Sequence, residues 1–69
     1  MNDTPKTHAE AMQRLNATWD ELATLRPNIY TPKLIAANRA AAAVTGLNHL
    51  RRFVLSAEGL LYRIKAKLK

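Results

Sequence analysis

The segment RPNIYTPK, residues 26–33, decides the fold, because it separates two segments whose apolar residues recur at helical spacing. Pro27 ends the first segment, since the residue before a proline avoids the α-helical region. Thr31 is a good N-cap residue, and Pro32 suits the first helical position, where its missing N–H would have had no helical partner. A short loop of this kind typically joins two antiparallel helices.

The segment before the loop predicts a helix over residues 7–25. Thr7 and Glu10 have the spacing of a capping box, in which each side chain accepts a hydrogen bond from the other residue's backbone N–H. An apolar stripe follows at spacings of three and four residues and comprises Met12, Leu15, Trp19 and Leu22. This stripe gives the helix one face that needs a partner.

The segment after the loop predicts a long helix over residues 32–68. Its apolar residues form a heptad-like seam, comprising Ala36, Ala40, Ala43, Leu47, Leu50, Val54, Ala57, Leu61, Ile64 and Leu68. Gly46 offers an alternative, in which it ends one helix and Asn48 caps a third. Because the seam passes Gly46 without a phase shift, a single helix is favoured.

The expected fold is all-α, a single domain over residues 1–69 in which a short helix and a long helix form an antiparallel hairpin. At 1.5 Å per residue the helices would be about 28 Å and 55 Å long, so half of the second helix would lack a partner. The chain has no cysteine, so disulfides cannot supplement a small core. We therefore expect a homodimeric helical bundle with an interface formed by Leu47, Leu50, Val54, Leu61 and Ile64.

The sequence contains no recognisable catalytic arrangement, and we expect a protein that is not an enzyme. It has no Gly-rich phosphate loop, no nucleophile with a base at useful spacing, and no carboxylate pair in an apolar context. His8 and His49 lie far apart, so neither a metal nor another cofactor is expected. No signal peptide is visible, and residues 40–44, the longest apolar run, are too few to span a bilayer. These features favour a cytoplasmic location and no membrane partner.

The net charge of +6 is concentrated after residue 25, where the sequence has nine Lys or Arg residues and a single acidic residue, Glu58. Such an excess suggests an acidic partner. Arginine and exposed tyrosine are also common at binding hot spots. The predicted partner-binding residues are Arg26, Asn28, Tyr30, Arg39, Arg51, Arg52 and Arg63. In the alternative interpretation, the arginines only keep the chain soluble and Tyr30 folds back to cap the hairpin.

A second alternative is a small basic helix-turn-helix protein that binds DNA through residues 38–57. Gly46 would be the turn glycine, and the following helix would present His49, Arg51 and Arg52 to the major groove. Two features oppose it. Arg52 falls where such motifs usually bury an aliphatic side chain, and Thr45 replaces the usual apolar residue before the glycine.

The whole chain is similar to the small early proteins of temperate bacteriophages. The similarity lies in its length, its short capped helix, its Pro-bounded loop and its long basic helix. It most resembles their quorum-sensing anti-activator. The resemblance implies a dimeric helical protein, in the cytoplasm of a host bacterium, that binds and inhibits a LuxR-type (LasR-like) transcriptional activator. It also implies action on the motor ATPase of type IV pili. No sharp motif carries the resemblance, so it assigns no function to a numbered residue.

Overall fold

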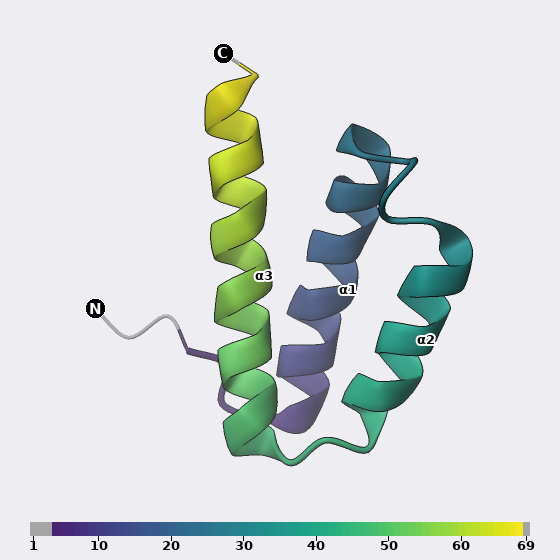
Figure 1. Ribbon diagram of the computed structural model, residues 1–69. Helices are drawn as coiled ribbons and strands as arrows, with labels where there is room; N and C mark the ends of the chain where they lie inside the picture. Colours follow the sequence, from purple (N-terminus) through teal and green to yellow (C-terminus); the bar gives the residue numbers. More distant parts are fainter. Residues whose placement is uncertain (1–3, 69) are drawn as a thin grey trace.

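The computed structural model describes residues 4–68, which form three α-helices and no strand (Figure 1). The helices are α1 (His8–Leu25), α2 (Pro32–Ala43) and α3 (Leu47–Lys67). In Figure 1, α1 lies between the other two. It packs mainly against α3 and to a lesser extent against α2, whereas α2 and α3 have little direct contact. The predicted all-α class is confirmed.

The ends of α1 and the start of α2 lie where the sequence places them. The Thr7 hydroxyl accepts a hydrogen bond from the Glu10 N–H at 3.1 Å, and the Thr31 hydroxyl accepts one from the Leu34 N–H at 3.2 Å. Each bond satisfies a backbone donor that the first turn of a helix leaves without a partner. Between the helices, the Tyr30 N–H donates to the Arg26 carbonyl at 2.9 Å, which closes the turn.

The structure differs from the sequence prediction at residues 44–46, because two helices replace the single helix expected over residues 32–68. The Thr45 hydroxyl donates to the Ala41 carbonyl at 2.8 Å, and His8 Nε2 donates to the Thr45 carbonyl at 3.0 Å. Gly46 is the N-cap of α3 with φ −64°, so it is not a left-handed turn glycine and Asn48 is not the cap.

The break has a physical cause in the packing that it allows. Gly46 weakens a continuous helix by about 1 kcal/mol relative to alanine. The break lets α3 fold back along α1, where Val54 and Leu61 are only 0% and 9% exposed. In a continuous helix both would lie beyond the end of α1, which is only about half as long. The predicted two-helix hairpin is therefore replaced by three helices.

The core lies mainly between α1 and α3. Leu15 and Leu22 of α1 are buried with residues of α3. These include all five that the sequence assigned to a dimer interface: Leu50, Val54 and Leu61 are buried, and Leu47 and Ile64 pack at the edge of the same cluster. The seam residues Ala36, Ala40 and Ala43, which fall in α2, are exposed, so that part of the predicted seam is wrong. The part of the seam in α3 packs in the core, and its partner is α1 of the same chain. These side chains are therefore not available to a second copy in this fold.

No helix within residues 4–68 is both long enough and apolar enough to cross a lipid bilayer. The molecule is flat, since its Cα atoms extend over 32 × 32 × 14 Å. Its radius of gyration is 12.0 Å, compared with about 11 Å expected for a compact chain of this length. The extra spread comes from α2 and α3 lying on either side of α1 with little direct contact.

Candidate functional site

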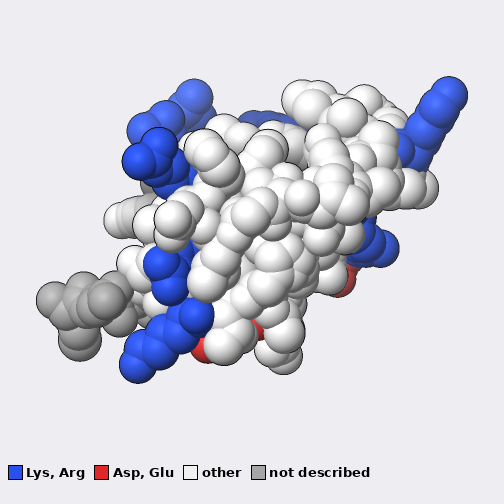
Figure 2. All heavy atoms as spheres, turned by 90° about the horizontal axis from the view of Figure 1, so that it is seen from below, with Lys and Arg blue, Asp and Glu red and all other residues white. Residues whose placement is uncertain are grey.

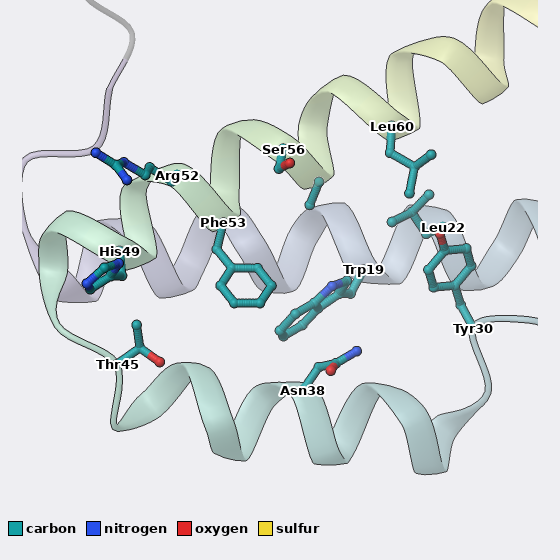
Figure 3. A pocket seen from close by; sticks show the side chains of 11 residues that line it. Trp19, Leu22, Tyr30, Asn38, Thr45, His49, Arg52, Phe53, Ser56 and Leu60 are labelled. Atoms are coloured by element: carbon teal, nitrogen blue, oxygen red, sulfur yellow. The ribbon is translucent and has the colours of Figure 1, made fainter.

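A groove of about 520 Å³ lies between α2 and α3 (Figure 3). We call it the α2–α3 groove. Trp19 and Leu22 of α1 form its floor, and Figure 3 shows the Trp19 and Phe53 rings projecting into the space between the two outer helices. Its lining residues are Trp19, Leu22, Tyr30, Asn38, Thr45, His49, Arg52, Phe53, Ser56, Ala57 and Leu60.

The groove exists because α3 is apolar on two adjacent stripes and α2 is made largely of alanine. One stripe, which includes Leu50 and Val54, packs on α1. The other contains Phe53 and Leu60, seven residues apart, and turns toward α2. The only residue of α2 that lines the groove is Asn38. Phe53 and Leu60 therefore stay 52% and 40% exposed, which leaves the groove open to solvent.

A second cavity of about 460 Å³ continues the groove toward the end of α3, and Leu60 lines both. We call it the C-terminal cavity. Its other lining residues include three cations, Arg26, Arg63 and Lys67. Together with Arg52 in the groove, they place positive charge at both ends of the apolar surface.

Two carboxylates of the chain are engaged in ion pairs that join α1 to α3. The Arg14 guanidinium donates to both Glu58 oxygens, with Nε at 3.0 Å from Oε2 and Nη2 at 2.6 Å from Oε1. Lys65 pairs with Glu21 on the surface. Among residues 4–68, none of those lining the groove or the C-terminal cavity is Asp or Glu. Seen from the end of the molecule that carries the 44–46 turn, the centre of the face is uncharged, basic side chains lie around its edge, and little acidic surface is visible (Figure 2).

Four of the seven predicted partner-binding residues lie in this region. Tyr30 and Arg52 line the groove, and Arg26 and Arg63 line the C-terminal cavity. Tyr30 is partly buried and packs against the core while facing the groove. It therefore caps the hairpin and also offers contact area.

The other three predicted residues lie elsewhere. Arg51 Nε donates to the Pro5 carbonyl at 2.8 Å and so holds the N-terminal segment against α3. Arg39 Nε donates to Asn16 Oδ1 at 2.8 Å, which ties α2 to α1. Asn28 is exposed in the interhelical turn and lines neither cavity.

Sequence reasoning did not assign Trp19, Phe53 and Leu60 to a site. Trp19 was expected in the core, and it is buried there with 5% exposure. It also lines the floor of the groove. The available signal was the spacing of Phe53 and Leu60, which repeats the heptad one position away from the core seam. Only the fold reveals that α2 leaves this second stripe uncovered.

No protein-family model, curated protein sequence or solved structure matches this chain. The site is therefore interpreted from its own geometry. Within the described residues, no group of three His, Cys, Asp or Glu side chains could hold a metal ion. What the groove offers chemically is an apolar floor and wall with cations at both ends.

Proposed function

We propose that this protein acts by binding another protein, without catalysis or a cofactor, and that the α2–α3 groove is the surface it uses. The observation that carries this proposal is the apolar surface left uncovered in the groove, where Phe53 is 52% exposed beside Trp19. Continuous apolar surface with a polar rim is typical of protein interaction sites.

We further propose, from the resemblance to phage anti-activators, that the partner is a LuxR-type transcriptional activator in the cytoplasm of a host bacterium. The motor ATPase of type IV pili is a second target. The net charge of +6 favours inhibition by direct contact, since a protein that imitated DNA would be acidic.

The test uses the purified chain and the purified DNA-binding domain of a LuxR-type activator. Calorimetry should show binding in the micromolar range or tighter, and adding the chain should remove the activator from its promoter fragment in a gel-shift assay. Absence of binding at about 100 μM, which corresponds to less than roughly 5.5 kcal/mol, contradicts this choice of partner.

The homodimer expected from the sequence stays a prediction, and it needs residues other than the predicted seam. Leu55 and Tyr62 are 45% and 67% exposed, and Leu55 lies about 200° around the axis of α3 from Phe53. A second copy could pack there and leave the groove free. Sedimentation velocity over a hundredfold range of concentration measures this, because a dimer dissociates on dilution.

DNA binding is a second candidate, and the turn at residues 44–46 favours it by joining two helices before the exposed side chains of His49 and Arg52. Against it, a groove separates α2 from α3, and Arg51 is engaged with the Pro5 carbonyl. The salt dependence of binding affinity distinguishes DNA binding from protein binding. A DNA complex with several phosphate contacts should weaken by orders of magnitude between about 50 and 200 mM salt, whereas an apolar protein contact should change far less.

A further inference from the structure

We propose that the α2–α3 groove and the C-terminal cavity together bind one amphipathic α-helix of a partner protein, and that this helix is acidic on its polar flanks. This proposal rests on the proposed function, since it specifies the kind of protein segment that the groove recognises.

The dimensions fit a helix. The lining residues of α3 begin at His49 in the groove and end at Lys67 in the C-terminal cavity. At 1.5 Å per residue this distance is about 27 Å, the length of a helix of about 18 residues. An amphipathic helix lying in an apolar groove between two other helices is a recurrent mode of recognition.

The apolar side of the groove matches what such a helix carries. Phe53, Ala57 and Leu60 follow one another along α3 at helical spacing, above a floor that includes Trp19 and Leu22. An aromatic floor beside an exposed aromatic ring forms the kind of pocket in which a leucine or phenylalanine anchor contributes most of the binding energy. The open side of the groove leaves the partner's polar face in solvent.

The charges select an acidic partner. Arg52 lines the edge of the groove, while Arg26, Arg63 and Lys67 line its continuation. No carboxylate among residues 4–68 lines either part, and both Glu58 and Glu21 are already paired, with Arg14 and Lys65. An acidic flank on the partner therefore meets cations at both ends of the groove. Such complementarity contributes to specificity and to the rate of association.

The same charges disfavour a second copy as the occupant of the groove. Two grooves packed face to face would bring Arg52, Arg63 and Lys67 of one chain toward the same cations of the other. Like charges placed close together in an interface cost several kcal/mol. The charges therefore point to a different protein as the occupant.

The experiment titrates the full chain with a synthetic helical peptide of about 18 residues. The peptide has leucines along one face, glutamates on both flanks, and neither Trp nor Tyr. Trp19 is the single tryptophan of the chain and forms the groove floor, so its emission reports occupancy directly. We expect a saturable change in emission, with micromolar affinity that weakens as salt is raised from about 50 to 500 mM. No saturable change up to about 1 mM peptide overturns the proposal.

Two control peptides test the chemistry of the occupant. One carries lysine in place of each glutamate, and the other has the same composition with its leucines scattered around the helix. Both should bind at least tenfold more weakly. Equal binding of the lysine peptide overturns the acidic selectivity, and equal binding of the scattered peptide overturns the requirement for an apolar face.

Matched variants test the location. Phe53→Glu should weaken binding of the glutamate peptide at least tenfold. Leu55→Glu, which changes a residue of α3 with similar exposure (45% against 52%) on the opposite side, should change it less than twofold. Arg52→Glu should weaken binding several-fold. Lys33→Glu makes the same change of charge at an exposed residue of α2 that lines neither cavity, and it should not. Equal loss in Leu55→Glu and Phe53→Glu overturns the proposal.

A second copy in the groove would give a different result. The wild-type chain would sediment as a dimer, and Phe53→Glu would convert it into a folded monomer, which overturns the proposal. If Phe53→Glu does not fold, the Trp19 emission of the wild-type chain with the three peptides still tests whether an acidic helix occupies the groove.

Failure here and failure of the proposed function are distinguishable. A chain that binds the LuxR-type domain but not the glutamate peptide, and loses binding to that domain in Phe53→Glu, refutes the acidic helix alone. A chain that binds the peptide in the groove but not the LuxR-type domain refutes that partner alone.

Discussion

Replacing Leu50 with alanine separates a core within one chain from an interface between two chains. Leu50 is 0% exposed and belongs to the core formed with α1. Leu→Ala at such a site usually costs about 3 to 5 kcal/mol, part of it from the cavity left behind. The whole domain is expected to have a free energy of unfolding of about 3 to 10 kcal/mol, given its length. Leu50→Ala should therefore bring the protein close to unfolding at room temperature.

The assay is thermal and urea denaturation followed by circular dichroism at two protein concentrations about fiftyfold apart. A loss of about 3 kcal/mol should lower the Tm by roughly 12 to 24 °C. Because the structure buries Leu50 within one chain, this loss should be the same at both concentrations. Leu55→Ala is the control, since Leu55 is 45% exposed on the same helix. It should cost about 1 kcal/mol or less.

Two results would refute this reasoning. A loss below about 1 kcal/mol would mean that Leu50 is not in a packed core. A loss that vanishes at high protein concentration would mean that Leu50 packs against a second chain, as the heptad-like seam alone suggested.

Three further predictions follow from the fold. Gly59→Ala should raise the free energy of unfolding by about 0.5 to 1 kcal/mol, because Gly59 lies within α3 and a Cβ atom there meets nothing within 4 Å; a loss of stability in urea denaturation would contradict this. Glu58→Gln should lower the free energy of unfolding by about 1 kcal/mol by breaking the bidentate pair with Arg14, and an equal effect in 1 M salt would show that charge is not the cause. Backbone amides of α2 should exchange with solvent faster than those of α1 and α3, since α2 has only two buried residues; slower exchange in α2 would mean that it is more firmly held than its packing indicates.

Local signals were sufficient for α1 and for the first interhelical loop. Each helix boundary there is determined within a few residues, by backbone hydrogen bonding or by steric restriction. The residues responsible are Thr7, Pro27, Thr31 and Pro32. Such effects do not depend on the rest of the fold. They could therefore be read from the sequence alone.

The break at residues 44–46 could not be predicted in the same way. The apolar seam runs through Gly46 in phase, and a glycine alone costs a helix only about 1 kcal/mol. The deciding contribution is tertiary, because Val54 and Leu61 become buried only when α3 folds back along α1. Within α3, the heptad pattern gives the face that is buried without giving the neighbour that buries it. Within α2 it does not give the buried face, since Ile35 and Ala42 are buried and the seam alanines are exposed.

The candidate site was predicted in part for the same reason. Residue type and charge were enough to single out Tyr30, Arg52, Arg26 and Arg63, which the structure brings to the groove and its continuation. The groove itself depends on α2 being too rich in alanine to cover the Phe53 stripe of α3. That is a property of how three helices meet, so no single segment of sequence contains it.

We propose above that a partner protein occupies the α2–α3 groove. The most direct measurement is an NMR titration of the isotope-labelled chain with the purified DNA-binding domain of a LuxR-type activator. The single indole N–H signal of Trp19 and the backbone amide of Phe53 should shift on binding, while the amides of Leu55 and Tyr62, on the far side of α3, should stay in place. Shifts confined to Leu55 and Tyr62, with Trp19 unchanged, would contradict the account.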